Sequence, residues 1–207
     1  MLQIIDGEQH LPTCLFAHGA GAPMDSDFMQ TVAEGLAQNG IKVIRFEFPY
    51  MQERRESGKK RPPNRQPELL ESFEAVLNSQ NRPCVLIGKS MGGRMASLLA
   101  AQSPKLEKLV GVMALGYPFH PQGKPEKLRI EHLPDVQVPM AIVQGTRDAL
   151  GNQEEVRQMD LPKSLHIEWL EDGDHDLKPR VKSGFTHQQH LDRTIAFCAD
   201  FIKRCYS

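Results

Sequence analysis

The sequence predicts a three-layer α/β fold, with a mostly parallel sheet of about six strands between helices and no cap domain. Two observations support this prediction. Short, continuously apolar runs, typical of strands buried on both faces, recur along the chain. Between most of them lie longer segments with helical spacing of apolar residues, and helical crossovers between strands indicate a parallel sheet. We expect one domain over residues 1–207.

The expected elements follow in chain order. The strands are Leu11–Ala17, Ile41–Phe46, Cys84–Gly88, Leu109–Leu115, Val138–Gln144 and Leu165–Leu170. Helical apolar faces are formed by Phe28, Val32, Ala33 and Leu36, and by Leu69, Leu70, Phe73, Val76 and Leu77. Further helices are expected over Met91–Ala101 and from about Thr186 to Arg204. Two long segments, Tyr50–Pro67 and Gly116–Pro134, are expected to be irregular loops.

Composition excludes several classes of protein. The 207 residues carry 25 basic and 26 acidic side chains, and aromatic residues make up 6%, which argues against a nucleic-acid partner. No apolar run approaches the roughly 20 residues that span a membrane, and the first residues lack a secretory pattern. The four cysteines form no close pair, which favours reduced thiols. We therefore expect a cytoplasmic protein.

The sharpest motif is Gly88-Lys89-Ser90-Met91-Gly92-Gly93, a G-x-S-x-G pattern between an expected strand and an expected helix. A serine in such a tight turn is lifted above the sheet, at the positive end of the following helix. The motif predicts that Ser90 is a nucleophile. The alternative is that Ser90 only caps the helix.

A serine nucleophile needs a base, and the base needs an orienting carboxylate. In this setting the expected chain order is Ser, Asp or Glu, then His. Asp148 and His175 follow two successive expected strands, so Ser90, Asp148 and His175 would meet at the carboxyl edge of the sheet. Asp174 and Asp176 are alternatives for the orienting acid. A calcium loop over residues 171–176 is disfavoured by its spacing.

The segment His18-Gly19-Ala20-Gly21 follows the first strong strand. A tetrahedral intermediate needs backbone N–H donors around its oxyanion. We expect one donor from Met91 and the other from Ala20 or Gly21. His18 is expected to organise this loop and is also a candidate for substrate binding and, second to His175, for the base.

The two long segments supply the remaining candidate substrate-binding residues, Arg54, Arg55 and Tyr117. A charged, proline-containing segment such as residues 50–67 is most often a solvated loop, and the functional alternative is a basic rim that attracts anionic compounds. His187 and His190 have a spacing that can bind metal, but no third ligand accompanies them, so no metal is expected. No nucleotide-binding loop is visible, and no cofactor is expected.

These motifs together resemble the α/β-hydrolases, in particular small, cap-less members similar to dienelactone hydrolase. The strings GKSMGGR, LGYPFHPQGKPEKLR and QGTRDALG are similar to one branch with bacterial predicted hydrolases and the hydrolase-like domain of subunit 3 of the animal NSL acetyltransferase complex. The resemblance spans residues 11–203 and implies that the fold's two leading strands are missing or reduced to Leu2–Ile5. The nucleophile here is Ser90 rather than the cysteine of dienelactone hydrolases, so their substrate is not implied.

We therefore expect a serine hydrolase that cleaves a small ester or a related acyl substrate. The short spacings from Ser90 to Asp148 and from there to His175 leave no room for a lid domain. The alternative is a non-catalytic binding or scaffolding module on the same fold. A protein partner is compatible with the sequence, but nothing in it indicates one.

Overall fold

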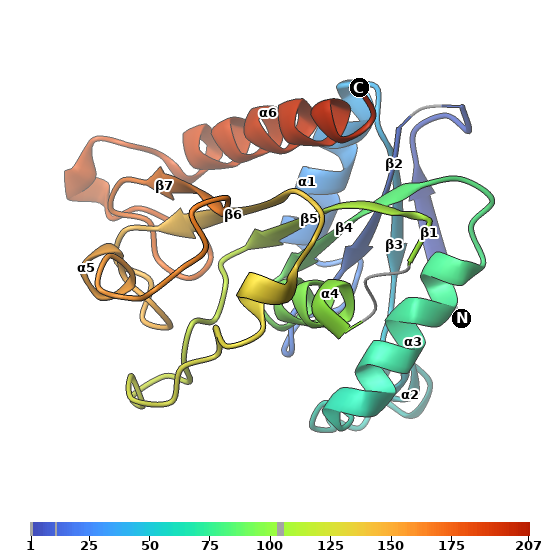
Figure 1. Ribbon diagram of the computed structural model, residues 1–207, viewed down its shortest axis with the longest axis horizontal. Coiled ribbons are helices and arrows are strands. Elements are labelled where there is room, and N and C mark those ends of the chain that lie inside the picture. The colour runs from blue at the N-terminus through green and yellow to red at the C-terminus, as the bar shows by residue number, and fades with distance from the viewer. Residues whose placement is uncertain (1, 11, 103–105) are drawn as a thin grey trace.

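The computed structural model describes residues 2–10, 12–102 and 106–207 and has a seven-stranded sheet between two helical layers (Figure 1). The strands are β1 (Gln3–Asp6), β2 (Thr13–Ala17), β3 (Lys42–Phe46), β4 (Cys84–Lys89), β5 (Leu109–Leu115), β6 (Met140–Gly145) and β7 (His166–Leu170). Their order is β1-β3-β2-β4-β5-β6-β7, and every pair is parallel except β1 with β3.

The predicted fold class is confirmed, with one strand more than the six expected. Strands β2 to β7 fall on the six apolar runs, although Leu11, the first residue of the first run, lies outside the described residues. Strand β1 overlaps the Leu2–Ile5 remnant and pairs antiparallel with β3, with Gln3 opposite Phe46. A four-residue edge strand with partly exposed side chains lacks the continuous apolar pattern of the buried strands.

Helices cover both faces of the sheet. Figure 1 shows α1 (Asp27–Gln38) and α6 (His187–Cys205) on one face, and α3 (Gln66–Asn78) and α4 (Met91–Gln102) on the other. Successive residues of the buried strands serve opposite faces: Leu15 packs towards α3 and α4, whereas Phe16 packs towards α1 and α6. Shorter elements are α2 (Pro49–Ser57), α5 (Gln153–Val156), η1 (Leu133–Asp135) and η2 (Val181–Ser183).

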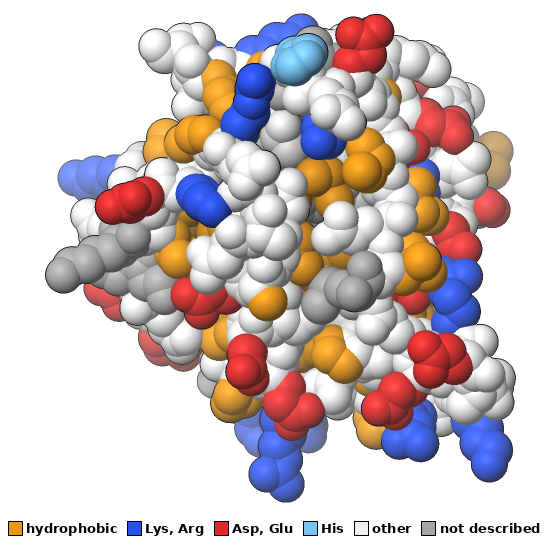
Figure 2. All heavy atoms as spheres, turned by 90° about the vertical axis from the view of Figure 1, so that its right-hand side faces the viewer, with side chains coloured by type: hydrophobic (Ala, Val, Ile, Leu, Met, Phe, Trp, Pro, Cys, Tyr) orange, Lys and Arg blue, Asp and Glu red, His pale blue; other side chains and the backbone are white. Residues whose placement is uncertain are grey.

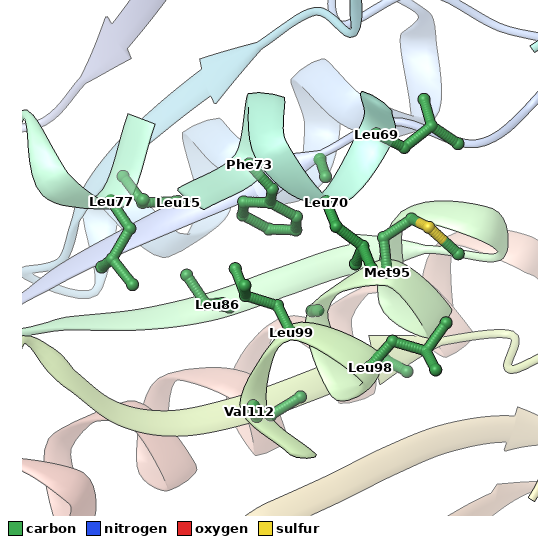
Figure 3. Close-up of a cluster of buried hydrophobic side chains, with 14 of the residues drawn as sticks. Leu15, Leu69, Leu70, Phe73, Leu77, Leu86, Met95, Leu98, Leu99 and Val112 are labelled. Atoms are coloured by element: carbon green, nitrogen blue, oxygen red, sulfur yellow. The ribbon is translucent and has the colours of Figure 1, made fainter. Parts of the chain in front are cut away.

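The core between α3, α4 and the sheet holds the segment that carries Ser90 in place. In Figure 3 Leu70 and Phe73 of α3 face Met95 and Leu99 of α4, with Leu15 and Leu86 of the strands beside them. The Phe73 ring lies 4.9 Å from that of Phe46, measured between centroids. Each fully buried side chain of this size contributes about 1.5–3 kcal/mol. The start of α4 is therefore anchored by its buried face.

The expected loop over residues 50–67 is partly helical, which corrects the sequence-based interpretation. Helix α2 begins with Pro49 at its first position and ends before Gly58, whose φ of 68° gives a left-handed cap. Tyr50 and Met51 are buried in the core.

Within the described ranges, no helix has the length and apolarity that a membrane crossing requires.

Candidate active site

Ser90 lies at a sharp turn between β4 and α4. Its φ of 51° is in the left-handed region, which costs a non-glycine residue about 1–3 kcal/mol. The turn is so tight that a Cβ on Gly92 would lie 2.6 Å from the carbonyl oxygen of Ala17, and Gly88 packs directly on the backbone of Gly92. Only glycine fits at these two positions. The surrounding structure thus maintains the strained turn and lifts the Ser90 side chain above the sheet.

Three sequence-predicted residues meet at this edge of the sheet. Ser90 Oγ lies 2.8 Å from His175 Nε2, and His175 Nδ1 lies 2.8 Å from Asp148 Oδ2. Asp148 is fully buried, and it also accepts hydrogen bonds from the Leu150 N–H at 2.8 Å and from Gln144 Nε2 at 2.9 Å. The residues come from the ends of β4, β6 and β7. They form a continuous hydrogen-bonded chain from hydroxyl to imidazole to carboxylate.

The two alternative acids are placed elsewhere. Asp174 Oδ1 accepts hydrogen bonds from the backbone N–H groups of Asp176 and Lys178, so it stabilises the turn that carries His175. Asp176 pairs with Lys89 at 3.1 Å. Of the three carboxylates considered, Asp148 is the one on the His175 ring.

The two histidines with metal-like spacing hold the same turn from α6. His187 Nε2 lies 3.0 Å from the carbonyl oxygen of Asp176, and His190 Nδ1 lies 2.8 Å from that of Leu177. Among residues 2–10, 12–102 and 106–207, no group of three or more His, Cys, Asp or Glu side chains could hold a metal ion. His187 and His190 therefore act here as backbone partners of the His175 loop.

His18 lies beneath the glycine-containing loop and is fully buried. Its Nε2 accepts the Phe48 N–H at 3.1 Å, so Nδ1 carries the proton and donates to the Gly19 carbonyl at 2.7 Å. Burial lowers the pKa of His18, which favours this neutral form. The imidazole holds the loop and does not line the pocket beside Ser90.

The other candidate substrate-binding residues, Arg54, Arg55 and Tyr117, are not among the residues that line that pocket. Tyr117 is fully buried, and its hydroxyl donates to the Arg129 carbonyl at 2.8 Å. Arg55 pairs with the buried Glu47 at 2.7 Å and with Asp25 at 2.8 Å, so its charge is already neutralised. Arg54 donates to the Gly21 carbonyl at 3.1 Å. Their side chains were expected to face substrate, but each is engaged by the protein itself.

The expected basic rim is also weaker than its sequence suggested. Figure 2, which views the molecule from the side of β1, shows acidic and basic side chains intermingled at the lower edge, where Figure 1 places α2. Arg61 pairs with Glu53 at 3.0 Å on this side. Mixed charges of this kind produce little net field at a distance.

Lys89 is the site residue that the sequence interpretation missed. Its side chain is only 10% exposed, yet it ends a strand of apolar residues. The ammonium donates to the His175 carbonyl at 2.6 Å and pairs with Asp176 at 3.1 Å. Burial lowers the pKa of Lys89, and the opposing charge of Asp176 offsets part of this effect. A lysine at the end of an otherwise buried strand was the available signal.

A pocket of about 370 Å³ opens beside Ser90. It is lined by residues 19–22, by Ser26, Phe28 and Met29 near the start of α1, and by Lys89, Ser90, His175 and Asp176. The segments 50–67 and 116–134 were both expected to border the mouth, but neither contributes any of these lining residues. The pocket is suited in size to a small organic molecule.

Comparison with known proteins agrees with this architecture. A family model described as an alpha/beta hydrolase domain matches residues 11–203. The structure is similar to a dienelactone hydrolase from Anabaena variabilis, with a TM-score of 0.72 and 20% identity over 98% of this chain and 90% of that chain. Est1E from Butyrivibrio proteoclasticus gives a TM-score of 0.70 and 13% identity over 99% and 93% of the two chains. The mouse alpha/beta hydrolase domain-containing protein 10 gives a TM-score of 0.65 and 15% identity over 98% of this chain and 93% of that chain. At these identities the likeness shows a shared fold.

Proposed function

The chain belongs to the alpha/beta hydrolase domain family, and from this premise we propose that it is a serine hydrolase cleaving a small ester or a related acyl compound. The observation that carries the proposal is the chain of two 2.8 Å contacts from Ser90 through His175 to Asp148. A pocket of about 370 Å³ beside Ser90 offers room for the acyl compound. These features match the nucleophile, base and orienting acid that acyl transfer requires.

In the proposed reaction Ser90 Oγ attacks the ester carbonyl carbon while His175 Nε2 takes the hydroxyl proton. Asp148 accepts a hydrogen bond from the Nδ1–H group of His175, which fixes the tautomer and stabilises the imidazolium. When the tetrahedral intermediate collapses, the carbon–oxygen bond to the alcohol breaks and His175 returns the proton to the leaving alcohol. Water then attacks the acyl-enzyme with His175 again as base, and the acid and free Ser90 are released.

The oxyanion of the intermediate requires N–H donors next to Ser90. Met91 is the first residue of α4, where a backbone N–H has no partner within the helix. Ala20 and Gly21 line the pocket together with Ser90. We assign the oxyanion hole to the N–H of Met91 and to that of Ala20 or Gly21.

Labelling with a fluorophosphonate probe tests this proposal. We expect the wild type to be labelled and Ser90→Ala to be unlabelled. Ser26→Ala is the matched control, because Ser26 also lines the pocket but lacks a base, and this variant should be labelled like the wild type. A folded wild type that resists the probe at high concentration would refute the proposal and favour a non-catalytic binding module.

A further inference from the structure

The carbonyl oxygens of three consecutive loop residues are held by side chains beneath the loop. Gly19 O accepts from His18 Nδ1 at 2.7 Å and lies 3.3 Å from the Tyr50 hydroxyl. Ala20 O lies 3.0 Å from the same hydroxyl, which therefore shares its proton between the two oxygens. Gly21 O accepts from Arg54 at 3.1 Å. Tyr50 and Arg54 both belong to α2, so this helix, together with His18, determines the direction of the three carbonyl groups.

The direction of a carbonyl fixes the direction of the next N–H, because the two point opposite ways across a trans peptide. With the oxygens of Gly19, Ala20 and Gly21 directed towards α2, the N–H groups of residues 20–22 point away from it. Among the described residues no hydrogen bond uses these three N–H groups. Residues 19–22 line the pocket that contains Ser90. The loop thus presents free donors on its pocket side.

We propose that Tyr50 is a positioning residue for the reaction: its hydroxyl orients the Gly19–Ala20 and Ala20–Gly21 peptides so that their N–H groups meet the oxyanion. The inference rests on the proposed serine hydrolase function. Arg54 supports the adjacent peptide from a more exposed position.

Tyr50 is built into the fold in a way that suits this role. Its side chain is 2% exposed, and its backbone N–H donates to Asn64 Oδ1 at 2.8 Å, which fixes the start of α2. The Tyr50 ring lies 5.8 Å from the His18 ring, measured between centroids. Burial raises the pKa of the Tyr50 hydroxyl, so the group remains a protonated donor. A rigid donor of this kind preorganises the loop before substrate arrives.

Tyr50→Phe tests the proposal, because it removes one oxygen atom and keeps the buried ring. The readouts are the second-order rate of Ser90 phosphonylation by a fluorophosphonate and the affinity for an alkyl trifluoromethyl ketone, whose adduct with serine carries an oxyanion. Since the N–H groups remain but lose their orientation, we expect both quantities to fall roughly tenfold, less than for complete loss of a donor.

Tyr206→Phe is the matched control. The Tyr206 hydroxyl also bonds to two backbone carbonyls, those of Thr13 and Pro83, but at the opposite end of the sheet. The Tyr206→Phe variant should lower the thermal unfolding temperature by about as much as Tyr50→Phe does. It should leave the phosphonylation rate and the ketone affinity within about twofold of wild type. Arg54→Met should slow the hydrolysis of neutral and anionic esters equally. If Arg54 instead steered substrates electrostatically, only the hydrolysis of the anionic ester would be slowed.

The outcomes separate the inference from the function on which it rests. If the wild type is labelled at Ser90 and Tyr50→Phe reacts as fast as Tyr206→Phe, the positioning role is wrong while the hydrolase proposal stands. If the wild type is not labelled, the hydrolase proposal itself fails. A loss in Tyr50→Phe matched by an equal loss in Tyr206→Phe would show a general stability effect and overturn the inference.

Discussion

Asp148→Asn tests whether a single buried carboxylate fixes the tautomer of His175. All three polar neighbours of the Asp148 carboxylate are donors: His175 Nδ1 and Gln144 Nε2 on Oδ2, and the Leu150 N–H on Oδ1. An amide has only one acceptor oxygen, and its nitrogen donates. The amide nitrogen, which is itself a donor, must therefore face at least one of these three donors.

Both orientations of the amide harm the site. With its oxygen towards Leu150, its NH₂ faces His175, which must then accept at Nδ1 and carry its proton on Nε2. That tautomer has no lone pair for the Ser90 proton. With its oxygen towards His175, the NH₂ meets the Leu150 N–H and leaves a buried donor unsatisfied, which costs about 1–3 kcal/mol. The negative charge that stabilises the imidazolium is lost in either case.

We expect kcat to fall by about 10⁴, which corresponds to about 5.5 kcal/mol of transition-state stabilisation. The assay is hydrolysis of p-nitrophenyl acetate, with thermal unfolding to verify the fold. Asp174→Asn is the control, because Asp174 contacts the backbone of the same turn and not the imidazole. A folded Asp148→Asn variant with more than a tenth of wild-type kcat would refute the assignment, as would a larger loss in Asp174→Asn.

Two further predictions concern Lys89 and His132. Lys89→Met keeps the aliphatic stem but leaves the His175 carbonyl without its donor, so we expect a roughly tenfold lower kcat with little change in KM. An unchanged kcat in ester hydrolysis would contradict the role of Lys89. Burial, and secondarily the charge of Arg94, lowers the pKa of His132 from 6.5 to about 4. The unfolded chain binds this proton more tightly, so the free energy of unfolding should fall by at most about 2–3 kcal/mol between pH 6.5 and 4. Urea unfolding at pH 7 and 4.5 measures this fall, and the free energy of unfolding of His132→Asn should fall by less than that of the wild type. An equal fall in both proteins would refute the role of His132.

The central part of the fold was predictable because each buried strand is apolar on both faces. The strands Cys84–Lys89 and Met140–Gly145 are buried along their whole length, and their continuous apolar runs predict them without tertiary information. Strand β1 gives no such signal, since it is short, lies at the edge and exposes part of each residue. The pairing of β1 with β3 follows from tertiary structure that a four-residue pattern does not encode.

Helix α2 was missed for a different reason. Its sequence is rich in charge and carries only two buried residues, Tyr50 and Met51, so it lacks an apolar stripe. Its end signals were nevertheless present, with Pro49 at the first position and Gly58 at the left-handed cap. Weighing these two residues above the charge content would have predicted a nine-residue helix.

The site was predictable where backbone topology alone places a side chain. Ser90, Asp148 and His175 each follow a parallel strand, and parallel strands bring their carboxyl ends to one edge. Tyr117 and Arg55 depend on the direction of a side chain within an irregular segment or on a short helix. That direction is set by partners distant in sequence, such as the Arg129 carbonyl and Glu47, which local patterns do not reveal.

The two loops of the site share one principle of construction. The loop over residues 19–21 is held by its carbonyl oxygens through His18 and Tyr50, and the His175 loop is held in the same way through Lys89, His187 and His190. Holding the loop over residues 19–21 by its carbonyls leaves the N–H groups of residues 20–22 unused by any hydrogen bond among the described residues, and holding the His175 loop in the same way leaves the imidazole on Ser90. A site without a cap domain cannot rely on closure over the substrate to assemble its donors. In the proposed mechanism its N–H donors must already point at the position of the oxyanion in the free protein, and side chains beneath the loops provide that order.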